Sequence, residues 1–84
     1  AVSRKDRSLA DQMRRAAQSV VLNCAEAQHA RGKRSVDRFS IAYGEASELK
    51  AALRLAALFG YADVGEQVIQ RCDEVCAMLY RLSR

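Results

Sequence analysis

The sequence predicts an all-α protein, built as an up-and-down antiparallel helical bundle. Apolar residues recur at spacings of three and four in three segments, which is the period of an amphipathic helix. Proline is absent and only four glycines occur among 84 residues, whereas β-rich folds need many turns. No run of β-branched and aromatic residues alternates with period two. This length suits one domain, so we expect a single domain over residues 1–84 with helices at about 8–31, 35–59 and 63–83.

The first predicted helix begins at Ser8, because Asp11 stands three positions after it in a near capping box. It ends near Gly32, since glycine readily adopts the left-handed conformation that stops a helix. Residues 1–7 are charged and lack a helical stripe, so we interpret them as a solvated tail or as a linker. The apolar stripe of this helix comprises Leu9, Met13, Ala16, Val20, Asn23, Cys24 and Ala27.

The second predicted helix, capped by Ser35, carries apolar residues in two rows. The first row follows the seam pattern of a helix bundle and contains Phe39, Ala42, Ala46, Leu49, Leu53 and Ala56. The second row contains Ile41, Glu45, Glu48, Ala52, Leu55 and Phe59. A three-helix core covers only one row, so this helix is either central or part of an oligomer contact. We predict that Ile41, Leu55 and Phe59 contact a second subunit or a further helix.

A short connection separates the second predicted helix from the third. Gly60 is placed to end the second helix and Asp63 to cap the third. Connections of a few residues force neighbouring helices to run antiparallel. Fifteen of the hydrophobic residues are alanine, so each core residue buries little area and self-association is expected to add stability. The third seam contains Val64, Val68, Cys72, Val75, Leu79 and Leu82.

Residue types that catalyse reactions or bind metals are scarce. His29 is the only histidine and stands in a polar stretch, so we interpret it as a solvated surface residue. Cys72 and Cys76 lie one helical turn apart, but a zinc site needs four ligands, and we interpret both as core thiols. The chain has neither a Glu-x-x-His motif nor a glycine-rich phosphate loop. We therefore expect no catalytic residue, no metal and no cofactor.

Three polar residues are expected to support the fold. A buried polar group without a partner costs ~1–3 kcal/mol, so Asn23 should bond to backbone near the helix junction. Glu26 should pair with a cation such as Arg38. Glu48 should pair with an arginine across an interface or cap a neighbouring helix.

Positive charge is concentrated in the first half of the chain. Residues 1–38 contain nine lysines and arginines against four acids, a net charge of +5, whereas residues 39–84 carry −1. Lysine and arginine bind phosphates whatever the base sequence of the nucleic acid. Aromatic residues on which bases could stack are scarce in this chain. The alternative is that these charges only keep the surface solvated. The predicted nucleic-acid contacts are Arg14, Arg15, Arg31, Lys33, Arg34 and Arg38.

The sequence also indicates the cellular compartment in which the protein is expected. The longest uncharged apolar stretch, 55–62, falls far short of the ~20 residues of a membrane span. Three cysteines is an odd number, and they lie inside apolar helical stripes, so a disulfide framework is not expected. We therefore predict a cytoplasmic protein with no membrane partner.

Six short motifs follow one another along most of residues 9–82. They are Gln12-Met13-Arg14-Arg15-Ala16-Ala17, Ser19-Val20-Val21-Leu22-Asn23-Cys24-Ala25-Glu26, Arg38-Phe39-Ser40-Ile41-Ala42, Gly44-Glu45-Ala46-Ser47-Glu48-Leu49, Leu58-Phe59-Gly60-Tyr61 and Met78-Leu79-Tyr80. In this order they resemble the bacterial four-helix bundle family encoded in intervening sequences of 23S ribosomal RNA genes. A related branch is the accessory protein of diversity-generating retroelements.

The resemblance implies an up-and-down four-helix bundle, commonly a ring-shaped homopentamer, with no established enzymatic activity. Its first helix would lie before residue 1, so a fourth, N-terminal helix is expected beyond the three. In the related branch, a basic pentamer is associated with reverse transcriptase and nucleic acid. The family usually has Ala-Glu-Gly after the asparagine, whereas Ala27 follows Glu26 here. The helix end is therefore expected to move to Gly32.

These observations predict a non-enzymatic, homo-oligomeric helical-bundle protein. Its basic face would bind RNA, DNA or a nucleic-acid enzyme such as a reverse transcriptase. The alternative is a structural or protein-binding scaffold without a nucleic-acid role. Salt distinguishes the two, because phosphate binding weakens steeply with ionic strength and apolar assembly does not.

Overall fold

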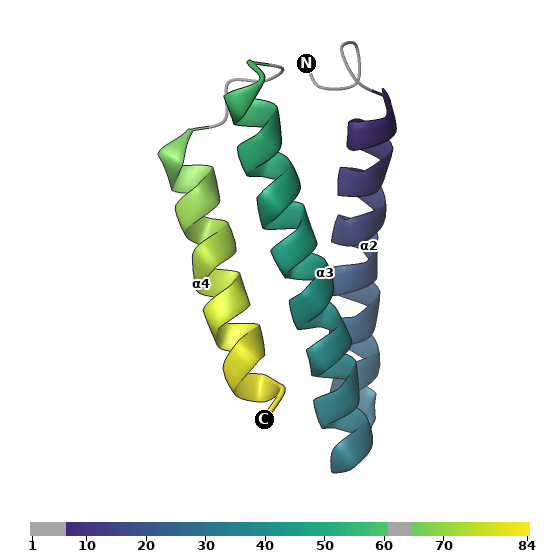
Figure 1. Ribbon diagram of the computed structural model, residues 1–84. Coiled ribbons are helices and arrows are strands. Elements are labelled where there is room, and N and C mark those ends of the chain that lie inside the picture. The colour runs from purple at the N-terminus through teal and green to yellow at the C-terminus, as the bar shows by residue number, and fades with distance from the viewer. Residues whose placement is uncertain (1–6, 61–64) are drawn as a thin grey trace.

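The computed structural model describes residues 7–60 and 65–84, which form three α-helices (Figure 1). Helix α2 spans Arg7–His29, α3 spans Lys33–Leu58 and α4 spans Glu66–Leu82. These two described ranges contain no strand. The prediction of an all-α helical bundle is confirmed for this part of the chain.

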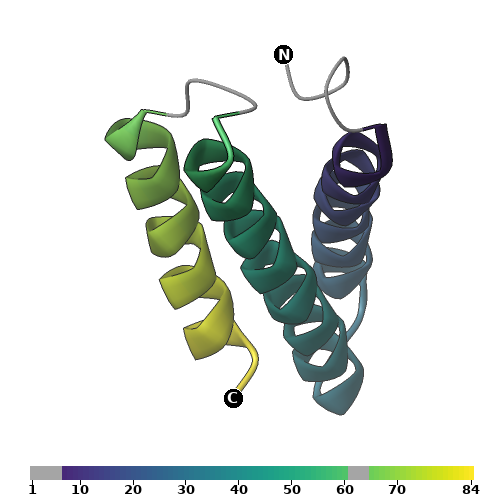
Figure 2. The same ribbon diagram turned by 45° about the horizontal axis from the view of Figure 1, so that its top comes forward.

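Helix α3 is central. It packs against α2 on one side and α4 on the other, and both neighbours run antiparallel to it (Figures 1 and 2). The backbone is elongated, with extents of 42 × 22 × 13 Å. Because of the up-and-down order, α4 ends on the same side of the molecule as the turn between α2 and α3 (Figure 1).

The start of α3 differs from the prediction. The helix begins at Lys33, so Ser35 does not cap it. Gly32 occupies the N-cap position with φ 58° and ψ −130°, a combination that favours glycine and occurs in tight turns. The Ser35 hydroxyl instead donates a hydrogen bond to the carbonyl oxygen of Ala27 at 3.0 Å. The turn is so short that this hydroxyl reaches the last turn of α2 and joins the two helices.

The remaining helix ends are closer to the sequence prediction. Because α2 begins at Arg7, Ser8 lies inside the first turn and is not the N-cap. After the end of α3, Gly60 has the positive φ, 71°, expected of a glycine that stops a helix. The predicted cap Asp63 lies outside the described residues, and α4 begins at Glu66.

The core is built from small side chains, as the alanine content predicts. Its central cluster joins Ala42 and Ala46 of α3 to Cys76 and Leu79 of α4. Partly buried neighbours from α2 and α3 close over this cluster, namely Val20, Cys24, Phe39 and Tyr43. The first apolar row of α3 is therefore the row that faces its two neighbours. Small side chains let the helices approach closely but remove little apolar area from water.

Polar contacts also hold α4 against α3. Lys50 Nζ lies 2.8 Å from Asp73 Oδ1, and this hydrogen bond raises the pKa of Lys50 and lowers that of Asp73. Both groups are solvent-accessible, so the pair contributes little to stability. The rings of Tyr43 and Tyr80 pack at 5.5 Å between centroids, and the Arg84 guanidinium lies 4.9 Å from the centre of the Tyr80 ring.

The second apolar row of α3 is exposed. Ile41, Leu55 and Phe59 have relative exposures of 40–56%. Ile41 and Leu55 line grooves between α2 and α3, and Phe59 directly follows the end of α3. Of the helices in the described ranges, none has the length and apolar content needed to cross a membrane.

Candidate nucleic-acid interface

The turn between α2 and α3 gathers three cations at one end of the molecule. Arg31 lies in the connection, and Lys33 and Arg34 form the first turn of α3. All three are exposed, and within the described residues none of them forms an ion pair. We call these three residues the basic turn.

The start of α3 adds to the positive potential of the basic turn. Its first turn contains no acidic residue, and no side chain caps its amide groups. An uncapped helix N-terminus carries the positive end of the helix dipole. The opposing C-terminus of α2 is partly neutralised, because the Ser35 hydroxyl and the amide of Ala30 bond to its last carbonyls. The local field is therefore suited to anions.

A network between α2 and α3 holds the backbone next to the basic turn. Arg38 Nε lies 3.0 Å from Glu26 Oε2, which is the pair expected from the sequence. Arg38 Nη1 also donates to Asn23 Oδ1 at 3.4 Å. Asn23 Nδ2 in turn donates to the Ser19 carbonyl oxygen at 2.9 Å, one turn back in its own helix and not at the helix junction. The Asn23 side chain therefore links the backbone of α2, at Ser19, to the Arg38 side chain of α3.

This network gives Arg38 a different environment from the basic turn. Its guanidinium is directed to Glu26 and Asn23, although it is still half-exposed. A phosphate would have to compete with the carboxylate for it. Arg38 was predicted both as a phosphate contact and as the partner of Glu26, and the geometry favours the second role.

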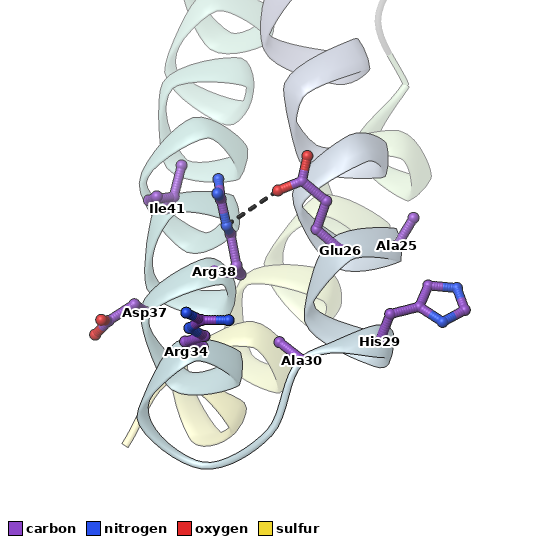
Figure 3. Close-up of a pocket in the computed structure, with 8 residues that line it drawn as sticks. All are labelled: Ala25, Glu26, His29, Ala30, Arg34, Asp37, Arg38 and Ile41. Atoms are coloured by element: carbon purple, nitrogen blue, oxygen red, sulfur yellow. Dashed lines mark ion pairs between the residues drawn. The ribbon is translucent and has the colours of Figure 1, made fainter.

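A groove of about 830 Å³ lies between α2 and α3 beside the basic turn. In Figure 3, the Arg34 guanidinium lies over the start of α3 and points toward α2, whereas Asp37 points away from α2. Alanines and an isoleucine form its apolar part. The arrangement exposes a cation to any anionic ligand that approaches the turn. The lining residues are Ala25, Glu26, His29, Ala30, Arg34, Asp37, Arg38 and Ile41.

Two predicted phosphate contacts lie apart from the basic turn. Arg14 forms an exposed ion pair with Asp11 at 3.1 Å. Arg15 lines a second groove together with Glu45, Glu48 and Leu55. Both arginines are about sixteen residues before Arg31, which corresponds to roughly 24 Å along a helix. They therefore do not extend the surface formed by the basic turn.

The structure adds a cation that the sequence analysis did not include. Arg81 lies exposed in the last turn of α4, which ends on the same side of the molecule as the basic turn (Figure 1). Arg84 follows but stacks on Tyr80. The predicted up-and-down order already places the end of the third helix beside the first turn. Combining that order with the charge count would have identified Arg81.

The cysteines and the histidine occupy different settings. Burial raises the pKa of the Cys24 and Cys72 thiols, so both stay protonated at neutral pH and are weak nucleophiles. Cys76 is buried in the core cluster. His29 is exposed at the end of α2. Among the described residues, no three His, Cys, Asp or Glu side chains are grouped as metal ligands.

Replacing Asn23 by alanine is expected to lower the melting temperature. The substitution removes the bond to the Ser19 carbonyl and one of the contacts that position Arg38. A loss of about 1 kcal/mol corresponds to roughly 4–8 °C for a domain of this size. Thermal unfolding followed by circular dichroism measures the change. Gln28→Ala, at an exposed position of α2, is the control and should shift the curve little; equal curves for both variants would contradict the structural role.

Comparison with known proteins gives one match. Residues 2–81 match the family described as 23S rRNA-intervening sequence protein. The matched range includes the basic turn, both grooves and nearly all of α4. No curated protein and no solved structure is significantly similar to the chain.

Proposed function

Since this chain belongs to the 23S rRNA-intervening sequence protein family, as its motifs predict, we propose that it is a non-enzymatic helical-bundle protein that binds RNA or DNA. The basic turn is the proposed contact surface. Binding is directed to phosphates and does not depend on base sequence. A nucleic-acid enzyme such as a reverse transcriptase is a further partner that this surface would meet through the bound nucleic acid.

The observation that carries the proposal is the exposure of three cations without carboxylate partners. Arg31, Lys33 and Arg34 form no ion pair within the described part of the chain, whereas Arg38, Arg14 and Lys50 each do. Unpaired cations keep their full attraction for phosphate, since no local carboxylate must be displaced. The uncapped start of α3 strengthens the same field.

We further propose that the protein assembles into a homo-oligomer, with a pentamer favoured by the family resemblance. The support is the second row of α3, where Ile41, Leu55 and Phe59 are half-exposed. Burying the remaining exposed half of such a row against a second copy gains about 1 kcal/mol per large side chain, which is half of the ~1.5–3 kcal/mol for full burial. In a ring, every subunit would present its basic turn at the same rim, so the positive fields would add.

A scaffold without a nucleic-acid role is the second candidate. The same exposed row favours it, because an apolar surface serves protein contacts whether or not phosphate is bound. The two candidates make opposite predictions about salt. Phosphate binding by several cations weakens steeply between 50 and 200 mM salt, whereas apolar contacts persist.

Sedimentation of the intact protein with a fluorescent RNA tests both parts of the proposal. We expect the protein to sediment as an oligomer at all salt concentrations. The RNA should sediment with it at low salt and separate from it as salt rises. A stable monomer would contradict the assembly. RNA that never sediments with tens of micromolar protein, about the range of non-specific binding, would leave only the scaffold.

A further inference from the structure

We propose that the basic turn prefers a double-stranded nucleic acid to a single strand. This inference rests on the proposed function and narrows its ligand class. It depends on two properties of the surface, which are the position of the aromatic side chains and the rigidity of the backbone that carries the cations.

The aromatic rings nearest the basic turn are already packed against other side chains. Phe39 packs against the core cluster, and Tyr43 and Tyr80 pack on each other. Tyr80 is 45% exposed near the end of α4, but the Arg84 guanidinium lies 4.9 Å from its ring centre. Phe59 follows the last residue of α3, about 26 residues and roughly 39 Å along the helix from Lys33. Proteins that bind single strands rely on stacking of successive bases on exposed rings. The imidazole of His29 is exposed at the end of α2, two residues before Arg31.

The backbone that carries the cations of the turn is held by contacts between α2 and α3. Gly32 confines the connection to a tight turn, and the Ser35 hydroxyl bonds to the Ala27 carbonyl across it. The ion pair between Glu26 and Arg38 fixes the same two helices one turn further along. A frame of this kind keeps the backbone positions of the three cations at constant spacing. A duplex presents its phosphates at constant spacing too, whereas a flexible single strand must lose conformational freedom to match it.

Charge density favours the same ligand. A duplex carries twice the phosphates of one strand along its axis, and each contact releases about 0.9 counterions against about 0.7 for a single strand. Three cations per subunit then give a roughly 40-fold loss of duplex affinity between 50 and 200 mM salt, and a roughly 20-fold loss for the single strand. Both ligands respond to salt, but the duplex responds more steeply.

Fluorescence anisotropy with two labelled probes tests the preference. One probe is a blunt RNA duplex about two helical turns long, and the other is an unstructured single strand of the same nucleotide length. At low salt, we expect the intact protein to bind the duplex about tenfold more tightly, which corresponds to one missing base–aromatic stack. Equal or tighter binding of the single strand overturns the preference and leaves the proposed function standing. Failure to bind either probe overturns both.

Replacing His29 by alanine tests whether bases stack on this ring, and the substitution should leave the fold of the turn intact. His29 is exposed at the end of α2, and its side chain forms no hydrogen bond or ion pair with the other described residues, so truncating it leaves the backbone contacts of the turn in place. We expect the ratio of duplex to single-strand affinity to stay within about twofold of its original value. A selective loss of single-strand binding would show that bases stack on the imidazole, and it would overturn the argument that the turn lacks a stacking surface.

Discussion

Exchanging Lys33 and Arg34 for glutamate is expected to weaken RNA binding by about a hundredfold at 50 mM salt, because counterion release makes each phosphate contact worth roughly tenfold there. Both side chains are exposed and lack carboxylate partners within the described residues. The new acids would also repel phosphate. A filter-binding titration of the intact protein measures the loss, and the salt dependence should become shallower.

A loss of RNA affinity caused by unfolding can be distinguished from a loss of phosphate contacts. Acidic residues in the first turn of a helix interact favourably with its dipole, so the double substitution at the start of α3 should preserve helix content. Circular dichroism checks this. The matched control is Arg7→Glu with Arg71→Glu, which makes the same change in net charge at exposed positions of α2 and α4. If both double variants lose the same affinity, net charge and not the basic turn determines binding.

Truncating Leu79 to alanine is expected to produce the largest loss of stability, about 2–5 kcal/mol. Leu79 is 2% exposed and belongs to the cluster that joins α4 to α3. Its neighbours Ala42, Ala46 and Cys76 are small and offer little to fill the cavity. A domain of this size has only a few kcal/mol of stability to lose. Urea unfolding followed by circular dichroism should show a much lower midpoint with an unchanged slope.

Leu22→Ala is the matched control for that experiment. The same atoms are removed from a side chain of α2 that is 62% exposed, so the free energy of unfolding should fall by less than about 0.5 kcal/mol. If the two variants lose equal stability, the assignment of Leu79 to the core is wrong. If Leu22→Ala alone is destabilised, the outer face of α2 is buried in the assembled protein.

Helix periodicity identified the buried positions of α3 in advance. Ala42, Ala46 and Ala56 of the first row are buried in the structure, because residues spaced by three and four lie on one face of a helix. The same argument found the exposed row of Ile41, Leu55 and Phe59. Periodicity states which residues share a face. It does not state which face meets a neighbour, and that depends on where α2 and α4 lie.

Capping was predicted less well, and Ser35 shows the reason. A serine hydroxyl accepts a hydrogen bond from a helix amide in one conformation and donates one to a carbonyl oxygen in another. The choice is made by the turn at Gly32, which brings the Ala27 carbonyl within reach of the hydroxyl. That carbonyl is eight residues away in sequence, so no local rule includes it. The pair of Glu26 and Arg38 was predictable because antiparallel neighbours joined by a short turn place such positions opposite each other.

By itself, the sequence determined the helical class, the three segments, the small-residue core and the excess of positive charge. These properties depend on composition and on local spacing, which tertiary contacts change little. Only the tertiary structure decided which of these positive charges are paired with acids and which stay exposed. It pairs Arg14 and Arg38 with acids, places Arg15 in another groove and leaves Arg31, Lys33 and Arg34 exposed together. The physical reason is that an ion pair depends on the distance between two side chains in space, and that distance is set by how the helices pack.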